Sequence, residues 1–509
     1  MEPIHTDQPG NILLKQLADI FPPEAQIYLV GGAVRDRLLG KPYHDFDLVI
    51  REQAIQSARK TANLLGGAFY ILDKERDYGR IVLELSNGEI FYLDFAACQG
   101  ADLESDLRSR DFTMNAMAFE IHQPTHLVDP CKGLQDLKDH CIRACSPDSF
   151  NRDAIRVLRA IRQAVALDFK IEPQTRTWLK AAVPMVSEIS AERIRDEIFR
   201  GLEGSHPSRC WRLYDAVGLL PVLFPELEAL KGVYQDPPHT LDVWNHSLAV
   251  LDGLERILGV LADNRWESNA GDLKLAQASL YLGKFRDRLI QHINTAFTPL
   301  RSRKAMLYLS ALFHDVAKPQ KETRDHSGNQ HFYRHEELGA EMASNRCEGM
   351  ELSVLETRYM ETLVKHHMRA HHLARNPDLV SKKAIYRFFR DCGSIGIDLC
   401  LLSLADTLGT YGVTLPEDRW LNEIQVCRNL FDAYWEQHDT VVAPKRVING
   451  DDLMVKLQLQ PGPMIGRLLE AIREAQVSGD VKDQQEAIAY AEKLIRRWNL
   501  ESTNSKPKL

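Results

Sequence analysis

The sequence predicts an α+β protein in which an N-terminal domain with a mixed sheet precedes helical domains. Strand-like and helix-like segments alternate over the first part of the chain. Beyond it, apolar residues recur at the helical spacings of three and four. A chain of 509 residues is also too long for a single core. We expect a head at 1–145, a neck at 146–235, a body at 236–440 and a tail at 441–509.

The composition places the chain among ordinary globular proteins. It is 44% hydrophobic and 26% charged, and its formal net charge is −8. Any surface that binds RNA must therefore be a local cluster of basic residues. The nine cysteines include no C-x-x-C pair, which argues against a disulfide framework and a cysteine zinc site. Because we find no signal segment and no apolar run of about 18 residues, we expect a cytoplasmic protein with no membrane partner.

The head begins with a helix and then a strand, a turn, a short helix and a second strand within Tyr28–Ile50. Alternation and β-branched residues then predict three further strands, and helical spacing predicts one more helix. These segments are a helix at Asn11–Ile20, a helix at Glu52–Leu65, and strands at Ala68–Leu72, Arg80–Glu84 and Glu89–Phe95.

Two aspartates in the second strand are the first candidate site. Residues two apart in a strand point to the same face, so Asp45 and Asp47 project side by side. Two carboxylates this close repel each other unless a cation lies between them, and oxygen ligands suit Mg²⁺. Just upstream, Gly31 and Gly32 leave backbone N–H groups accessible to phosphate oxygens. The stretch therefore indicates metal-assisted nucleotidyl transfer.

The order GG-x-V-R-D-x-L-L-G-x(4)-D-x-D, at Gly31–Asp47, resembles the head signature of class II nucleotidyltransferases. This is the family of the tRNA CCA-adding enzymes and the bacterial poly(A) polymerases. The resemblance implies that Arg35 belongs to the nucleotide site with the two glycines. It also implies a third carboxylate near the end of a later strand, for which Asp94 is the candidate.

The resemblance continues through two more head motifs. Residues 106–118, DLRSRDFTMNAMA, resemble the family's Arg-Arg-Asp-Phe-Thr-x-Asn-Ala run, with Ser109 in place of the first arginine. Arg110 could bind triphosphate oxygens, and Asp111 could accept from a ribose hydroxyl. Residues 129–137, DPCKGLQDL, match a third motif, in which we expect a structural role, with a turn at Gly133 and Asp136 bracing the head–neck junction.

The neck is predicted to begin with one long helix at Ser149–Phe169. Its arginines recur at threes and fours as a basic stripe: Arg152, Arg156, Arg159 and Arg162. A solvated helix face is the ordinary interpretation of such a stripe. Family members carry Glu-Asp-x-x-Arg here as a protein template that selects C and A over G and U. Asp153 and Arg156 occupy two of these positions, while Arg152 replaces the glutamate and reverses its charge. With this resemblance, Arg159 and Arg162 join Asp153 and Arg156 as candidate nucleotide-binding residues.

A second constellation lies in the body, on segments with helical patterns. His246, then His314 with Asp315, then Asp406 follow the order of the HD phosphohydrolase superfamily. The resemblance implies a divalent metal of unspecified identity and hydrolysis of phosphate esters. More imidazoles occur at His335, His366 and His367, and Lys318 could contact phosphate; a lone histidine of this kind is ordinarily a core residue.

The tail resembles the C-terminal domain of the same family, with two or three helices that could anchor RNA or simply cap the chain. Taken over nearly the whole chain, the resemblance implies a tRNA nucleotidyltransferase that adds CCA, or part of it, from CTP and ATP with Mg²⁺. Alternatives with the same chemistry are a CC-adding enzyme, an A-adding enzyme and a poly(A) polymerase. Different classes are an HD phosphohydrolase with a nucleotide-binding head, and a non-catalytic RNA-binding protein.

Overall fold

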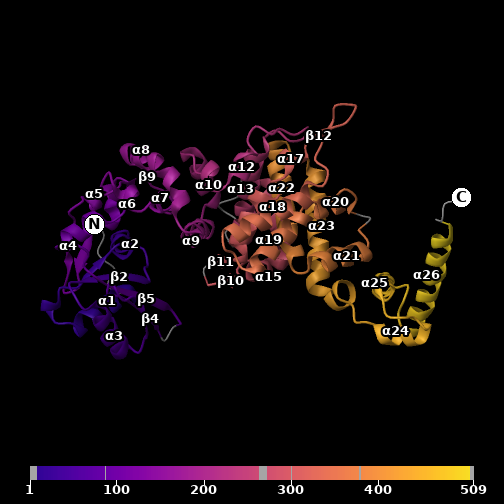
Figure 1. Ribbon diagram of the computed structural model, residues 1–509, viewed down its shortest axis with the longest axis horizontal. Coiled ribbons are helices and arrows are strands. Elements are labelled where there is room, and N and C mark those ends of the chain that lie inside the picture. The colour runs from indigo at the N-terminus through magenta and orange to yellow at the C-terminus, as the bar shows by residue number, and fades with distance from the viewer. Residues whose placement is uncertain (1–8, 86–87, 263–271, 300, 378–379, 505–509) are drawn as a thin grey trace. The chain divides into compact units, whose positions relative to one another are not determined.

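The computed structural model describes residues 9–85, 88–262, 272–299, 301–377 and 380–504 (Figure 1). The chain forms two compact units. The first comprises Met1–Glu197 with Leu213–Leu223, and the second comprises Ile198–Arg212 with Phe224–Leu509. A seven-stranded sheet lies in the head, and the rest is mostly helical, so the predicted fold class is confirmed. The bounds of the four domains stay a prediction.

The head sheet is mixed, and its strand order is β3-β4-β5-β2-β1-β6-β7. Only β2 and β5 pair in parallel; the other neighbours in this sheet are antiparallel. The four strands expected after the opening strand are present, and β6 and β7 were not foreseen. The strands are β1 (Tyr28–Val30), β2 (Asp45–Ile50), β3 (Ala68–Asp73), β4 (Tyr78–Glu84), β5 (Ile90–Ala97), β6 (Ala118–Glu120) and β7 (Gln123–Val128).

Both predicted head helices are present within two residues of the expected bounds. Helix α3 packs against β4 and β5, on the face opposite Asp45 and Asp47. That face carries the buried side chains Phe46, Leu48, Ile81 and Leu93. The head helices are α1 (Pro9–Ile20), α2 (Gly32–Leu38), α3 (Ala54–Leu65), α4 (Leu103–Ser109) and α5 (Gly133–Lys138).

The prediction of one helix over Ser149–Phe169 was wrong. The segment is a one-turn helix α6 (Ser149–Arg152), a break, and helix α7 (Arg156–Leu167). Asp153 lies in the break with an extended backbone, at φ −159° and ψ 100°. Helices α8 (Pro173–Ala182), α9 (Ala191–Leu202), α10 (Pro207–Val217), α11 (Leu220–Leu223) and α12 (Pro225–Glu228) follow, and β8 (Cys141–Ile142) pairs with β9 (Lys170–Ile171).

The body is a set of packed helices in which α13 (Val243–Ala262) contacts α16 (Arg303–Phe313) and α22 (Ile395–Tyr411). Two short strand pairs interrupt it, β10 (Ala296–Thr298) with β11 (Arg301–Ser302) and β12 (Thr323–Arg324) with β13 (Gln330–His331). The other helices are α14 (Leu273–Leu282), α15 (Arg286–Ile293), α17 (Lys318–Lys321), α18 (His335–Gly349), α19 (Val354–His366), α20 (Met368–Ala374), α21 (Lys382–Cys392) and α23 (Glu417–Glu436).

The tail has three helices around a small apolar core of its own, as two or three were expected. Helix α24 (Gly450–Leu457) is capped by Asn449, and α25 (Pro463–Ser478) and α26 (Gln484–Asn504) follow. Among the described residues, no single helix is long and apolar enough to cross a membrane. One bent pair, Lys382–Cys392 with Ile395–Thr414, passes that test by length and composition alone.

Candidate functional site

Three carboxylates of the head lie on one face of the sheet. Asp45 and Asp47 alternate along β2 with the buried Phe46 and Leu48, so both point away from the core. In the parallel pair of β2 and β5, Asp47 is the register partner of Asp94. Neighbouring strands are about 4.8 Å apart, and register partners point the same way. The structure therefore brings together the three carboxylates that the sequence singled out.

Asp47 is the most constrained of the three. Burial raises its pKa; Arg110 opposes the rise, whereas the carboxylates of Asp94 and Asp45 add to it. Acidic groups crowded in this way are unfavourable as anions unless a cation compensates for them. This donor set of oxygens, with repulsion left between its members, fits a hard divalent cation.

Gly31 allows the backbone to approach this carboxylate closely. It precedes α2 with φ at +73°, a conformation that favours glycine. A Cβ atom there would lie 2.6 Å from Oδ2 of Asp47 and 3.3 Å from a guanidinium nitrogen of Arg110. The glycine thus leaves the space in which the carboxylate and the arginine meet.

We predict that Gly31→Ala lowers nucleotide addition about a hundredfold, because the new methyl group displaces the Asp47 carboxylate. Steady-state addition of a labelled nucleotide to RNA measures the loss. Gly40→Ala is the matched control, since Gly40 has a similar φ of +66° but no atom within 4 Å of the added Cβ. Both variants lose about 1–3 kcal/mol of stability from backbone strain. Equal activity of the two would contradict the role given to Gly31.

Both oxygens of Asp94 already accept hydrogen bonds. Arg80, on β4, donates to them from Nε at 2.7 Å and from Nη2 at 2.7 Å, and the Tyr78 hydroxyl donates to Oδ2 at 2.7 Å. Arg80 is the register partner of Asp94 on the neighbouring strand. Arg80 was not predicted as a site residue, although it begins the strand predicted at Arg80–Glu84, and alternation along that strand was the available signal. A catalytic role for Asp94 stays a prediction.

The segment after α4 fastens the head to α7. Asp111 accepts from the backbone N–H of Phe112 and forms a 3.0 Å ion pair with Arg159. Asn115 donates to the Gln163 side chain at 3.0 Å, and it accepts from Arg35 at 3.0 Å. Arg35, bonded as well to its neighbour Asp36, is thus connected through one asparagine to the neck helix.

The break before α7 is fixed by Arg156. Its guanidinium donates to the backbone carbonyls of Ser109, Arg110 and Ser149, and to the Ser149 hydroxyl at 2.8 Å. Beside it, Asp153 forms a 2.7 Å ion pair with Arg193 of α9.

The predicted basic stripe is therefore divided among separate partners. Arg162 pairs with Glu197 at 2.7 Å, and Arg159 and Arg156 hold the head segment instead of facing solvent together. The break also changes the helical phase between Arg152, on α6, and the three later arginines, which all lie on α7.

The third head motif is structural, as expected. Asp136 accepts from the Thr113 hydroxyl at 2.7 Å and from Nε of Arg143 at 3.1 Å. A Cβ atom on Gly133 would lie 2.0 Å from the Thr113 carbonyl oxygen. The glycine is thus needed for close approach, and the turn itself uses Lys132 at φ 61°.

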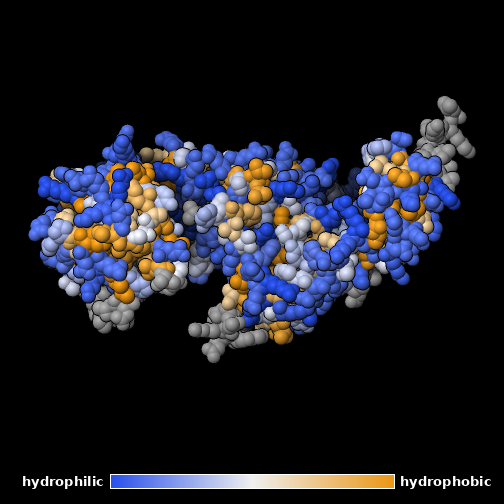
Figure 2. Space-filling model, turned by 90° about the horizontal axis from the view of Figure 1, so that it is seen from below, coloured by the Kyte–Doolittle hydropathy of each residue, from blue (hydrophilic) through white to orange (hydrophobic). Residues whose placement is uncertain are grey.

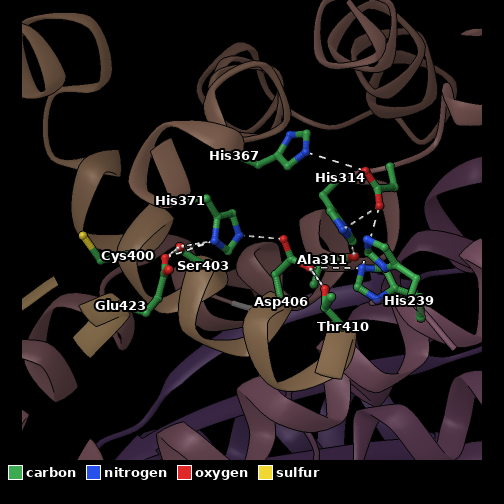
Figure 3. A network of polar contacts seen from close by, with 12 residues as sticks. His239, Ala311, His314, His367, His371, Cys400, Ser403, Asp406, Thr410 and Glu423 are labelled. Atoms are coloured by element: carbon green, nitrogen blue, oxygen red, sulfur yellow. Dashed lines mark hydrogen bonds and ion pairs between the residues drawn. The ribbon is translucent and has the colours of Figure 1, made fainter. Parts of the chain in front are cut away.

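The body histidines and aspartates meet in one buried network (Figure 3). Nε2 of His246, on α13, lies 3.1 Å from Asp406 Oδ1 on α22 and 3.7 Å from Asp315 Oδ2. Nε2 of His314 lies 3.2 Å from the same Asp315 oxygen. All four residues predicted for this site are thus brought together from three separate helical segments.

The imidazole rings are oriented as metal ligands would be. Nδ1 of His314 donates to the Ala311 carbonyl at 2.7 Å, which leaves the Nε2 lone pair facing Asp315. This Nε2 and Oδ1 of Asp315 are buried and lack a hydrogen-bond partner among the described residues. Orphaned donor atoms that converge in this way fit a divalent cation, and His246, His314 and Asp315 could hold it together.

Two further imidazoles approach the other oxygen of Asp315. Nε2 of His335 lies 3.3 Å from Oδ1, and Nε2 of His367 lies 3.6 Å from it. Each ring donates from Nδ1 to the carbonyl three residues before it, as His314 does. Lys318 donates to Oδ2 of Asp315 at 2.5 Å. His335 and His367 could therefore hold a metal ion together with Asp315.

The chain of polar contacts from Asp406 through His371 to Glu423 was not predicted. Nε2 of His371 lies 2.7 Å from Asp406 Oδ2, and its Nδ1 lies 3.1 Å from Glu423 Oε1 (Figure 3). Arg419 pairs with Glu423 at 3.1 Å. His371 follows His367 by one helical turn, which was the signal available. At His239, burial and the positive charges of His246 and Lys318 lower the pKa to about 4.

Four family models match the chain in order. Residues 27–143 match the poly A polymerase head domain, and 168–231 match a probable RNA and SrmB binding site of polymerase A. Residues 243–410 match the HD domain, and 422–491 match a putative tRNA nucleotidyltransferase domain 2. Asp45, Asp47 and Asp94 fall within the first match, and the buried network around Asp315 falls within the third.

Curated relatives resemble the chain over nearly all of its length. It is 32% identical over 494 residues to the A-adding tRNA nucleotidyltransferase of Deinococcus radiodurans, covering 95% of this chain and 98% of the relative. It is 30% identical over 467 residues to the CC-adding tRNA nucleotidyltransferase of Geobacter sulfurreducens, covering 92% and 91%.

Solved structures share the fold. The Thermotoga maritima CCA-adding enzyme complexed with tRNA matches with a TM-score of 0.54 and 21% identity, over 97% of each chain. A CCA-adding enzyme in complex with CTP matches with a TM-score of 0.58 and 21% identity, over 96% of each chain.

Proposed function

The chain belongs to the tRNA nucleotidyltransferase family, and from this premise we propose that it adds nucleotides from CTP and ATP to the 3′ end of tRNA. The observation that carries the proposal is the row of carboxylates on one face of the head sheet. Asp45 and Asp47 lie beside Asp94, and the backbone of Gly31 closely approaches the Asp47 carboxylate. We place this activity in the cytoplasm.

The family depends on a divalent metal, and we propose Mg²⁺ at Asp45 and Asp47 because the donors are oxygens alone. When bound, such ions lower the pKa of an attacking hydroxyl and neutralise charge on phosphates. In the proposed reaction, the RNA 3′-hydroxyl attacks the α-phosphate of the nucleotide and pyrophosphate leaves. Arg110, next to Asp47, would donate to the triphosphate oxygens.

The remaining candidates orient the nucleotide. Gly31 and Gly32 would offer backbone N–H groups to phosphate, and Asp111 would accept from the ribose while Arg159 holds it in place. Arg35 would act through Asn115. We propose these roles because the residues lie in the head together with the carboxylates.

Base selection would involve the break before α7. We propose that Asp153 accepts from the exocyclic amine of C or A and that Arg156 donates to a ring acceptor. Arg156 would first have to release its backbone carbonyls, and Asp153 would have to release Arg193. Arg162, paired with Glu197, supports the helix from behind. CC-adding, A-adding and complete CCA addition all remain within this proposal, and a poly(A) polymerase is the alternative with looser RNA choice.

Three tRNA transcripts test the proposal and separate its versions. They end before the first C, before the second C and before the terminal A, and each is offered CTP alone or ATP alone before its 3′ end is sequenced. We expect one or two C residues on the first transcript with CTP, a single A on the last with ATP, or both. Long A tails on unrelated RNA would instead favour a poly(A) polymerase.

We propose a second function, metal-dependent hydrolysis of phosphate esters, at the body site. The observation that favours it is the buried convergence of Nε2 atoms on Asp315, with Lys318 beside them to bind phosphate. The metal would be held by His246, His314, Asp315 and Asp406, with His335 and His367 as further ligands. Bound there, it supplies an activated water at neutral pH.

A further inference from the structure

The face of the head sheet that carries the carboxylates is covered on one side only. Val49 points the same way as Asp47, since they are two residues apart, and it packs with Val30, Leu107 and Ala118 into a small apolar cluster. This cluster lies over β1 and β6. The carboxylates therefore sit at the border between a packed half of this face and the half formed by β5, β4 and β3.

The second half of the face exposes aromatic and aliphatic side chains. Tyr92 is the register partner of Asp45 and is 38% exposed, and Ile90, two residues before it, is 44% exposed. Tyr70, the register partner of Arg80, is 54% exposed. Their neighbours along the strands face α3 on the other side of the sheet. Figure 2 shows hydrophobic side chains gathered on the outside of the head among hydrophilic ones.

A fixed positive charge lies beside this surface. Arg80 is held by two hydrogen bonds to Asp94, and its guanidinium carbon is 5.6 Å from the ring centroid of Tyr92. A cation at this distance attracts the ring and limits its rotation. The surface thus combines an ordered aromatic face, a cation and a direct border with Asp45, which is the combination that binds single-stranded nucleic acid.

We propose that Tyr92, together with Arg80, is the platform on which the 3′-terminal base of the acceptor RNA stacks. The inference rests on the proposed function. The 3′-hydroxyl must reach Asp45 and Asp47, and the packed side of the face is closed by Val30 and Leu107. The terminal nucleotide must therefore lie over the open half, where Tyr92 is the first side chain beyond the carboxylates.

The chemistry of the platform suits a growing end. An enzyme that adds more than one nucleotide meets a different terminal base at each step. Stacking on an aromatic ring tolerates every base, because each base has a π-face, whereas hydrogen bonds to base edges would discriminate between them. Tyr70, two strands further along the same face, would continue the surface toward the preceding base.

The test combines a protein change with an RNA change. For whichever truncated tRNA transcript the wild-type protein extends, Tyr92→Ala should raise the KM about tenfold, the loss expected for one stacked base, and leave the KM for the nucleotide unchanged. Tyr92→Phe should restore the wild-type value. Leu64→Ala is the control, since Leu64 lies on α3, across the sheet from Tyr92, and is 61% exposed. Melting temperatures of the variants verify folding.

The same transcript with an abasic 3′-terminal nucleotide completes the cycle. With the wild-type protein, the KM for the abasic transcript should be about tenfold higher than the KM for the intact transcript. With Tyr92→Ala, the two transcripts should have the same KM. The inference would be overturned if the protein change and the RNA change raised the KM independently, so that their factors multiplied, or if Tyr92→Ala left the KM unchanged. In either case, nucleotide addition by the wild-type protein would still support the proposed function.

A crosslinking experiment decides the platform independently of catalysis. A 3′-terminal 4-thiouridine on the transcript should crosslink to the peptide that contains Tyr92, and this crosslink should disappear in Tyr92→Ala. Crosslinks confined to other peptides would overturn the inference. If the wild-type protein bound RNA and crosslinked at Tyr92 but added no nucleotide, the proposed function alone would fail.

Discussion

Asp47→Asn is expected to lower nucleotide addition about a thousandfold or more, because it removes one of the two carboxylates that we propose hold Mg²⁺. Loss of several kcal/mol of charge stabilisation in the transition state corresponds to such a factor. Asp45→Asn should behave in the same way, since both carboxylates point to one face of β2. Single-turnover incorporation of CTP or ATP into tRNA measures the effect.

The fold of Asp47→Asn should remain intact. Burial and the nearby Asp94 and Asp45 raise the pKa of Asp47, so its ionised form is unfavourable in the folded protein without metal. A raised carboxyl pKa gives stability that is present below the unfolded value and is lost as the pH rises through the folded value. At neutral pH with a chelator, the variant should therefore melt at the wild-type temperature or above it.

Asp19→Asn is the matched control for this prediction, because Asp19 is exposed on α1, away from the carboxylate face. It should add nucleotides at the wild-type rate. Wild-type rates in both Asp45→Asn and Asp47→Asn would contradict the assignment of the head centre.

Asp315→Asn is expected to abolish phosphate ester hydrolysis, by about a hundredfold or more, and to leave nucleotide addition unchanged. Asp315 lies within reach of the four imidazoles of His246, His314, His335 and His367, so its loss affects every histidine proposed to hold the metal. Ring opening of nucleotide 2′,3′-cyclic phosphates to monophosphates, and release of phosphate from simple phosphate monoesters, with and without divalent metal, measure the loss.

The reciprocal variant makes this test decisive. Asp47→Asn should keep the hydrolase activity that Asp315→Asn loses, and Asp315→Asn should keep the addition that Asp47→Asn loses. A melting curve of Asp315→Asn is needed, since Lys318 loses an ion pair there. A folded Asp315→Asn variant with full hydrolase activity would contradict the body site.

Local patterns were sufficient to predict the positions of the principal acids. Alternation placed Asp45 and Asp47 on one face of a strand, and β2 bears this out. The strand order of the sheet was not predictable in the same way, because β2 pairs with β5 across three intervening elements. The register partner of Asp47, and with it the Arg80 pair of Asp94, became visible only in the folded sheet.

The neck shows where periodicity misleads. Apolar spacing continues from Ile155 onward and suggested one helix from Ser149, but hydrogen bonds from Arg156 to the carbonyls of Ser109 and Arg110 fix a break. Partners so distant in sequence leave no trace in a helical pattern. In the body, order and residue type predicted four buried residues correctly as neighbours, whereas the contacts of His371 depend on how α20 packs against α23.

The most direct test of the central claim is the 3′ sequence of two tRNA transcripts, one that ends before CCA and one that ends before the terminal A. Each is incubated with the purified protein, CTP, ATP and Mg²⁺, and all 3′ ends are then read. The head centre predicts a defined extension of one to three residues, made of C, A or CCA, on at least one transcript, and Asp47→Asn should not produce it. Two unextended transcripts, or a tail of many A residues, would contradict it.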